Sequence, residues 1–462
     1  MVGESLDSSS ALGCVAHTRR MRLPRLPLVP DLLQRGPVPD DLDSVTSIGD
    51  EEDPAVAGMS RHGIDHIWEG VRDVYSGGAH PAIQVCVRRR GHKVLNRAIG
   101  YARGNGPGDD PDEEKVPATT GTPFVLYSAS KAMTAMVVHL LDQRGLLHLA
   151  DPVVEYFPEF GRHGKDGITI GHILSHRAGI PIHPTEITSL DYVNDRRTIV
   201  EALADARPYS EPGRFQAYHA LSGGAVIAEV VERITGSDIR DILAKEILDP
   251  LGFRWGNYGV AEDELGAVAR NYLTGLPSPP PISTALNRLL GTNVRNVVAM
   301  SNDPRFLTAI VPAGNIVSTA DELSRFYELL RCGGELDGVR IFDPRTIRRA
   351  VAKQSYQPVD FTLGFPIGYS YGFMLGGKYL SLFGPGTENA YGHLGFTFIF
   401  GWADPRRELS VGVVTSGKPV LYPEVLGLLG VLGRIGAAAL TQNLPTELRM
   451  PPNSDTRLIS IK

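Results

Sequence analysis

One short segment constrains this chain more than any other, because it combines a nucleophile, a base and the start of a helix. Ser128 and Lys131 are three residues apart, and residues at this spacing are neighbours on one face of an α-helix. A serine hydroxyl becomes an effective nucleophile when a neighbouring group takes its proton. A lysine can take that proton once burial or a nearby cation has lowered its pKa. The pair therefore predicts a serine that is activated by lysine.

The residues around this pair predict a buried helix. The apolar run 124–127 precedes it, and apolar residues follow at helical spacing: Met133, Met136, Val137, Leu140 and Leu141. Arg144 and Gly145 end the pattern, as last-turn cations and glycine do at helix C-termini. We therefore expect Ser128 at the positive end of a helix dipole, which favours a developing anion. Taken alone, the segment also fits an ordinary N-cap serine followed by an incidental lysine.

Further segments, together with this one, resemble the serine β-lactamase and penicillin-binding-protein superfamily. They occur in the family's order, at residues 124–131, 169–181, 212–218, 225–236, 248–253, 312–321, 392–395 and 403–405. The resemblance covers about residues 60 to 440 and is greatest with the class C β-lactamase-like carboxylesterases of family VIII, which include actinobacterial proteins called lipases. It implies an α+β, β-lactamase-like fold, with an antiparallel sheet flanked by helices and an inserted, mostly helical region.

The resemblance also implies roles for individual residues. Ser128 is expected to form the acyl-enzyme, with Lys131 and Tyr218 as base and proton relay and His393 assisting near the pocket. The backbone N–H groups of Ser128 and Phe396 are implied to form the oxyanion hole, and such donors contribute about 3 kcal/mol to transition-state stabilisation. We expect two nearby cations to lower the pKa of the Tyr218 phenol. A packing role for Tyr218 and a surface position for His393 are the alternatives.

Two departures from the family's β-lactam-binding motifs favour ester substrates. The Tyr-x-Asn motif is Tyr218-His219-Ala220 here, which removes an amide that helps to hold a β-lactam side chain. The Lys-Thr-Gly motif is His393-Leu394-Gly395 here. The lysine charge and the threonine hydroxyl are absent, which weakens the binding of a substrate carboxylate. Leu394 and Gly395 are expected in the substrate pocket. The resemblance therefore implies a serine carboxylesterase acting on a small-molecule ester, with no metal and no organic cofactor.

Two other functions remain open. A β-lactamase or a D-Ala-D-Ala peptidase would use the same nucleophile on amides, but its substrates lie outside the membrane and no export signal is recognisable. A non-catalytic relative would keep the cleft for binding, and the intact set of Ser128, Lys131 and Tyr218 argues against it.

Two motifs are weaker candidates for a site. Gly368-Tyr369-Ser370-Tyr371-Gly372 matches the nucleophile elbow of α/β-hydrolases, but no helix is predicted after Ser370, as that elbow requires. His172 and His176 have the spacing of zinc ligands, but the glutamate of zinc proteases is replaced by Ile173. A structural role is favoured for these residues.

The bulk composition excludes several classes of protein. The 462 residues, 42% of them hydrophobic, suffice for a large core. A net charge of −6 argues against a nucleic-acid partner. The odd number of cysteines, three, fits a reducing compartment. Neither an 18-residue apolar run nor the apolar core of a signal peptide is present. We therefore expect a cytoplasmic protein without a transmembrane segment, of undetermined oligomeric state.

The pattern along the chain suggests its organisation. Residues 1–58, rich in Pro, Ser and Asp, predict a disordered extension, although Arg19–Arg25 beside apolar residues leave peripheral membrane contact as an alternative. Residues 59–146 and 297–445 are expected to form an α/β part, residues 147–296 an inserted and mostly helical part, and residues 446–462 a tail. The expected elements are helices near 64–74 and 423–440, a hairpin of 82–88 with 93–99, and strands at 369–375, 397–403 and 409–415. The cleft is expected between the two parts.

Overall fold

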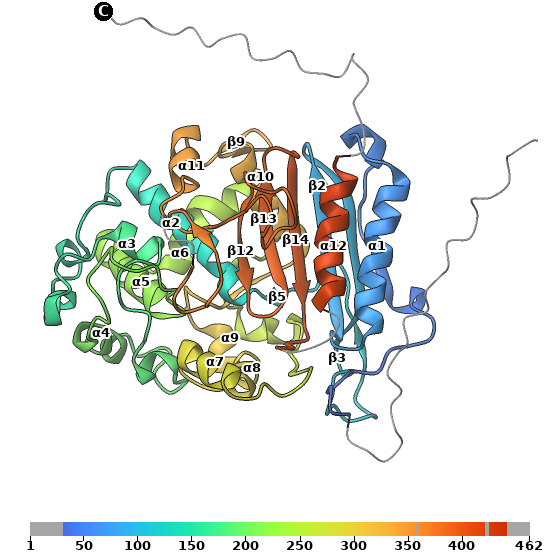
Figure 1. The fold of residues 1–462 in the computed structure, drawn as a ribbon, viewed down its shortest axis with the longest axis horizontal. Coiled ribbons are helices and arrows are strands. Elements are labelled where there is room, and N and C mark those ends of the chain that lie inside the picture. Colours follow the sequence, from blue (N-terminus) through green and yellow to red (C-terminus); the bar gives the residue numbers. More distant parts are fainter. Residues whose placement is uncertain (1–30, 356–358, 421–424, 441–462) are drawn as a thin grey trace, which may run out of the picture. The chain divides into compact units, whose positions relative to one another are not determined.

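A nine-stranded antiparallel sheet organises the chain. The structure is a computed structural model and describes residues 31–355, 359–420 and 425–440 (Figure 1). The strand order is β1-β3-β2-β14-β13-β12-β11-β10, with β4 beside β3. These strands are β1 (Thr46–Ile48), β2 (Ala82–Arg89), β3 (His92–Arg103), β4 (Val116–Pro117), β10 (Gly368–Tyr369), β11 (Met374–Leu375), β12 (Tyr391–Gly395), β13 (Ile399–Asp404) and β14 (Leu409–Thr415).

Helices cover both faces of this sheet. On one face, α1 (Arg61–Ser76) and α12 (Val425–Ala438) lie side by side, as Figure 1 shows. On the other face, α10 (Ala320–Arg331) packs on β2, β13 and β14. Gly412 permits this approach, because a Cβ at that position would lie 2.3 Å from the Ala320 carbonyl oxygen.

Strand β2 shows how the sequence fits this arrangement. Ile83, Val85 and Val87 belong to the core under α1 and α12, whereas Ala82 and Cys86 belong to the core that includes α10. Successive side chains of a strand point to opposite faces. All eight residues of β2 are buried, including the polar Gln84, Arg88 and Arg89, so both faces of the strand are covered and buried residues do not alternate with exposed ones.

The second part of the chain is mostly helical and lies beside the β10 end of the sheet (Figure 1). A small sheet, in the order β5-β7-β6, joins its segments. The helices are α2 (Ser130–Gln143), α3 (Ile170–Leu174), α4 (Arg196–Asp205), α5 (Ser222–Thr235), α6 (Ile239–Leu243), α7 (Ile282–Leu290), α8 (Val294–Met300), α9 (Pro304–Thr308) and α11 (Pro344–Ala350). The remaining strands are β5 (Phe124–Val125), β6 (Asn257–Tyr258), β7 (Ile316–Ser318) and the hairpin β8 (Glu335–Leu336) with β9 (Val339–Arg340).

The structure confirms the α+β class, with an antiparallel sheet flanked by helices and a second, mostly helical part. The predicted hairpin of β2 and β3 and the strand β14 are present. The strand expected at 369–375 is instead two short strands, β10 and β11, because the backbone turns at Gly372, where φ is +109°. Of the described residues, none belongs to a helix long and apolar enough to cross a bilayer.

The expected disordered extension over 1–58 is wrong in its second half. Residues 32–58 belong to the same compact unit as the sheet, and β1 pairs with β3 at the sheet edge. Acidic side chains support this edge, since Glu51 accepts hydrogen bonds from the Asn96 backbone N–H and the Arg97 guanidinium, at 2.9 and 2.7 Å. The basic segment Arg19–Arg25 and the expected tail 446–462 lie outside the described residues. The division at 146/147 and 296/297 stays a prediction.

Candidate active site

Ser128 lies in a tight turn between strand β5 and helix α2. The turn is a 3-10 turn over Tyr127–Ala129 and leads directly into α2 at Ser130. Tyr127 has a φ of +48°, a left-handed backbone conformation that is uncommon for a tyrosine. Its hydroxyl donates to Ser301 Oγ at 2.7 Å, and Ser130 Oγ accepts the Ile316 N–H at 3.0 Å. Ser128 is therefore held within the turn, and it is not the N-cap of α2.

Lys131 points back from the first turn of α2 toward Ser128. Its Nζ lies 3.1 Å from Ser128 Oγ and donates to the Ala313 carbonyl at 2.9 Å. Burial lowers the pKa of Lys131 to about 7, because a charged ammonium loses its hydration there. A substantial fraction of Lys131 is therefore neutral near pH 7, and a neutral amine can accept the Ser128 proton.

Tyr218 belongs to the segment just before α5 and lies opposite Ser128 and Lys131. Its ring centroid is 5.0 Å from Lys131 Nζ. Burial raises the pKa of Tyr218, and a hydrogen bond with Ser128 opposes the rise. The expected lowering of the pKa by nearby cations is therefore wrong. Among the described residues, the cation in contact with Tyr218 is Lys131, which is itself close to losing its charge, so the cost of burying a phenolate dominates.

His393 occupies the centre of strand β12 and is buried, with 1% of its surface exposed. The alternative of a surface histidine is therefore wrong. Its Nδ1 lies 2.8 Å from the Leu394 carbonyl oxygen, and its ring centroid is 6.3 Å from that of Tyr218. Burial, with the charge on Lys131 as a smaller cause, lowers the pKa of His393 to about 3. The imidazole is thus neutral at pH 7 and offers no positive charge to a substrate.

Gly395, at the end of β12, brings residues 393–395 against the turn that carries Ser128. A Cβ on Gly395 would lie 2.3 Å from the Leu126 carbonyl oxygen, so a larger residue would push the strand away. The next residue, Phe396, packs its ring 5.6 Å from the ring of Tyr127. The two backbone segments that carry Ser128 and Phe396 are therefore neighbours, as an oxyanion hole formed by their N–H groups requires.

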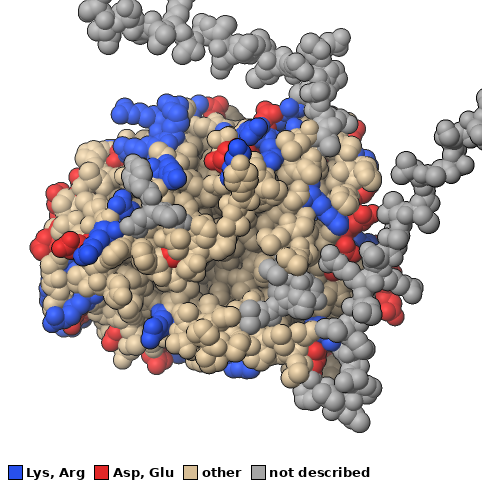
Figure 2. All heavy atoms as spheres, in the orientation of Figure 1, with Lys and Arg blue, Asp and Glu red and all other residues tan. Residues whose placement is uncertain are grey.

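A cavity of about 750 Å³ opens beside Ser128. Tyr218, Ala220, Leu394, Gly395 and Phe396 contribute to its wall. Most of the other walls are apolar and include Leu286, Leu289, Leu290, Phe306, Leu363, Phe365, Met374, Phe398 and Phe400. No Lys, Arg, His, Asp or Glu is present among the described residues that line it. Figure 2 shows the opening as a hollow between β12 and helices α7 and α8, on a face whose centre carries few charged atoms.

Two residues around Tyr218 were not identified from the sequence as parts of the site. Asp360 Oδ1 accepts the backbone N–H groups of Tyr218, Thr362 and Leu363, at 3.2, 2.8 and 2.9 Å. His176, at a left-handed φ of +57°, packs its ring 4.6 Å from that of Tyr218, and its carbonyl accepts the Ala217 N–H at 2.9 Å. Both residues fix the segment that carries the phenol. The left-handed histidine has no sequence signal, and Asp360 lies far from Tyr218 in the chain.

The two weaker motifs have structural roles. Ser370 is buried in the turn between β10 and β11, where its N–H donates to the Phe373 carbonyl at 3.0 Å; a strand follows it and not a helix. His172 caps α3, where its Nδ1 accepts the Thr169 N–H at 3.2 Å. Across the described ranges, no group of His, Cys, Asp and Glu side chains is arranged to hold a metal ion.

Several known proteins are similar to this chain. Esterase/beta-lactamase LipL from Mycobacterium tuberculosis is 28% identical over 345 residues, which cover 70% of this chain and 76% of LipL. An N-acetylmuramyl-L-alanine amidase from Bacillus subtilis is 25% identical, over 76% of this chain and 81% of the amidase.

Solved structures show the same similarity. EstA from Arthrobacter nitroguajacolicus has a TM-score of 0.67 and 28% identity, and the match covers 81% of this chain and 97% of EstA. A family VIII carboxylesterase has a TM-score of 0.68 and 25% identity, with the same coverage of 81% and 97%. A penicillin-binding protein homologue from Caulobacter crescentus shares the fold, with a TM-score of 0.70, 23% identity and coverage of 85% and 99%. The beta-lactamase family profile matches residues 64–425, more than half of the sequence, and the chain therefore belongs to the beta-lactamase family.

Proposed function

We propose that this protein is a serine carboxylesterase that hydrolyses uncharged carboxylic esters through an acyl-enzyme on Ser128. The observation that carries the proposal is the pairing of Ser128 and Lys131 at the edge of a cavity whose described lining residues carry no charge. The similarity to LipL, EstA and a family VIII carboxylesterase supports it.

The acylation step uses Lys131 as the base. Neutral Lys131 takes the proton of Ser128 Oγ while Oγ bonds to the ester carbonyl carbon. The N–H groups of Ser128 and Phe396 donate to the oxyanion, which is stabilised because these donors are already in place. As the tetrahedral intermediate collapses, the bond to the alkoxide breaks and the proton passes from Lys131 through Tyr218 to the leaving oxygen.

Deacylation repeats these proton transfers with water. A water molecule gives its proton to the Lys131–Tyr218 pair while its oxygen attacks the acyl carbon. The bond to Ser128 Oγ then breaks, Oγ regains the proton, and the carboxylic acid leaves. The raised pKa of Tyr218 suits a proton relay, because the phenol is protonated at the start and at the end of each transfer.

The walls of the cavity favour esters over carboxylate-bearing amides such as β-lactams. A carboxylate that leaves water needs a cation or several hydrogen-bond donors. His393 is neutral, Leu394 has no polar side-chain atom, and Ala220 provides no amide. A neutral substrate with an apolar body leaves no charge unpaired in this cavity, and the burial of its apolar surface favours binding.

A labelling experiment and a kinetic comparison test the proposal. An alkyl fluorophosphonate is expected to add to the Ser128 Oγ, located by peptide mass spectrometry, and the label should be lost in Ser128→Ala but kept in Ser370→Ala. A non-catalytic protein would take up no label. The kcat/KM for p-nitrophenyl butyrate is expected to exceed that for a chromogenic cephalosporin by about 10³ or more, which is the discrimination expected when a charged group lacks its partners. Equal or faster turnover of the cephalosporin would identify a β-lactamase instead.

A further inference from the structure

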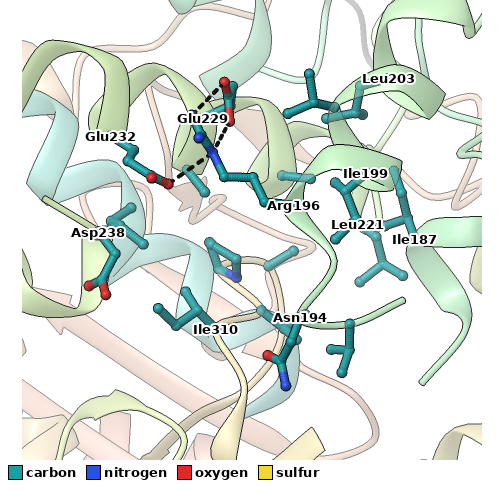
Figure 3. A pocket seen from close by; sticks show the side chains of 18 residues that line it. Ile187, Asn194, Arg196, Ile199, Leu203, Leu221, Glu229, Glu232, Asp238 and Ile310 are labelled. Carbon is teal, nitrogen blue, oxygen red and sulfur yellow. Dashed lines mark hydrogen bonds and ion pairs between the residues drawn. The ribbon is translucent and has the colours of Figure 1, made fainter. Parts of the chain in front are cut away.

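A second, smaller pocket of about 210 Å³ lies beside the catalytic cavity. It is a partly open pocket lined by helices α4 and α5, by the start of α6 and by the segment Ile310–Ala313. Figure 3 shows Leu203, Ile199, Leu221 and Ile187 along one side of this side pocket and Ile310 below them.

The side pocket shares a wall with the catalytic cavity. Five residues line both spaces: Ile187, Val193, Leu221, Val311 and Ala313. The wall is thus one layer of side chains thick. Ile187, Val193, Leu221 and Val311 are only half-buried, so they are not locked in a packed core. The wall also reaches the catalytic groups, because the Ala313 carbonyl accepts a hydrogen bond from Lys131.

The charged groups of the side pocket are already paired. Arg196 donates to both oxygens of Glu229, at 2.8 and 2.9 Å, and lies 3.2 Å from Glu232. In Figure 3 these contacts lie along the upper side of the side pocket. Asp238 accepts the Asp241 N–H at 2.8 Å, at the start of α6. No unpaired cation among the described lining residues is therefore left for a carboxylate, and the remaining described lining is apolar apart from the Asn194 side chain.

The size and the lining together define the ligand chemistry. An apolar cavity of about 150 Å³ is enough to hold a benzene molecule, so the side pocket takes an apolar group somewhat larger than a ring. Resting on the proposed function, we propose that the side pocket receives the distal end of a long alkyl chain of the ester whose carbonyl is held at Ser128. The alkyl chain crosses the shared wall after the Leu221 and Ile187 side chains change rotamer. Both a long acyl group and a long alcohol have this chemistry.

Two alanines allow the side pocket to be filled without changing the catalytic cavity. Ala225 and Ala228 on α5 line the side pocket but not the cavity at Ser128. Ala225→Phe and Ala228→Leu place new carbon atoms where the chain end is proposed to lie. Ala437→Phe is the matched control, because Ala437 is exposed on α12 and lines neither space.

Three esters separate the outcomes: p-nitrophenyl butyrate, p-nitrophenyl laurate with a long acyl group, and dodecyl acetate with a long alcohol. Each buried methylene is worth about fourfold in kcat/KM. Filling the side pocket is therefore expected to lower kcat/KM at least tenfold for one of the two long esters and to leave butyrate within about twofold. The long ester that is affected identifies whether the acyl or the alcohol chain enters. Ala437→Phe should leave all three rates unchanged.

A second variant covers the case in which the larger side chains disturb folding. Leu221→Ala thins the shared wall and is expected to raise the ratio of long-chain to butyrate kcat/KM at least threefold. The inference is overturned if neither long ester responds to any of the three variants, or if butyrate falls as much as the long esters do. Activity of the unmodified protein on butyrate tests the proposed function separately, because a protein that hydrolyses butyrate but ignores these substitutions refutes only the side pocket.

Discussion

Two lysines in this molecule are each mostly removed from water and yet have opposite pKa shifts. Lys93, on β3, has burial acting to lower its pKa, but hydrogen bonds to Asp50 and Asp321 outweigh it and the pKa is raised. Its Nζ lies 2.8 and 3.0 Å from these two carboxylates. Lys131 has burial as the only cause of its shift, and its pKa falls to about 7.

The comparison shows that the partner decides what a buried lysine does. At the sheet edge, carboxylates keep Lys93 charged, and the group contributes to stability. Beside Ser128, Lys131 has two oxygen partners, and neither carries a charge: a hydroxyl and a carbonyl. The low pKa that suits Lys131 to the proposed role of base is therefore a property of its surroundings, and each prediction below tests one side of this contrast.

The largest effect is expected at Ser128, the proposed nucleophile. Ser128→Ala should lower kcat on a nitrophenyl ester by about 10⁴ or more, as the loss of a nucleophile does in other serine hydrolases. Ser370→Ala, a buried serine outside the site, should keep activity within about threefold. An active Ser128→Ala protein would mean that the reaction does not use this serine.

The next effect separates the two lysines. Lys131→Ala is expected to slow acylation by about 10² or more, the range of a lost general base. Lys93→Ala should leave kcat/KM within about twofold, although it removes a cation that contacts both Asp50 and Asp321. Pre-steady-state release of nitrophenol measures the acylation step directly. Equal losses in both variants would show that Lys131 acts through stability alone.

Tyr218→Phe removes only the hydroxyl and is expected to slow turnover by about 10². The fold should be unaffected, because Asp360 holds the Tyr218 backbone and not its side chain. Esters with better leaving groups need less help from an acid, so the loss should shrink along a series of phenyl esters of decreasing leaving-group pKa. A loss that is constant along the series would remove Tyr218 from the proton relay.

The pH profile should report the pKa of Lys131. The base is active when neutral, so kcat/KM is expected to level off above pH 7 and to fall about tenfold per pH unit below about 7. An uncharged ester contributes no titration of its own to this profile. A plateau that extends unchanged to pH 5 would contradict the assignment of Lys131 as the base.

The smallest effects concern stability, and here the two lysines should have opposite signs. The pKa of Lys131 is about 7 in the folded protein, below its ordinary value of 10.5. The unfolded chain therefore binds more protons between these values, and stability rises with pH across this range. Lys131→Met should raise the free energy of unfolding by about 1–2 kcal/mol at pH 6, with the gain vanishing as the pH approaches 10.5.

Lys93→Met is the matched substitution for this measurement. It leaves Asp50 and Asp321 without their shared cation and should lower the free energy of unfolding by about 1 kcal/mol at both pH 6 and pH 9. Urea denaturation of both variants at pH 6 and pH 9 measures the sign of each change in the free energy of unfolding. Destabilisation by Lys131→Met at pH 6 would show that its two hydrogen bonds outweigh the cost of burying the charge.

The part of the site that could be predicted from the sequence is the part set by local geometry and by family motifs. Ser128 and Lys131 are neighbours because they are three residues apart at the start of a helix, and no distant residue is needed to infer it. The direction of the Tyr218 pKa could not be obtained in this way, because it depends on burial by residues far away in the chain. His176 and Asp360 were missed for the same reason.

In the fold, too, the elements set by local sequence patterns could be predicted, and those set by distant contacts could not. Strands β2, β3 and β14 follow from their apolar patterns, and the helix α1 from its periodicity. Strand β1 was missed, since a three-residue strand in a Pro- and Asp-rich segment is specified by its partner β3 and by the ion pair of Glu51 with Arg97. The split between β10 and β11 was missed because it depends on the contact of Gly372 with Ala135 of α2, where a Cβ would lie 2.1 Å away.

The close approach at Gly395 sets which positions can change as substrate preference evolves. The spacing of the two backbone segments beside Ser128 depends on a hydrogen atom in place of a side chain at this residue. Most walls of the cavity come from other segments, such as α7, α8 and the residues around Leu363. If the proposed function holds, mutations in these walls can alter which esters are accepted while the geometry around Ser128 stays intact. A library that varies Leu286, Leu289 and Leu363 but keeps Gly395 should therefore yield many active variants, whereas one that varies Gly395 should yield almost none.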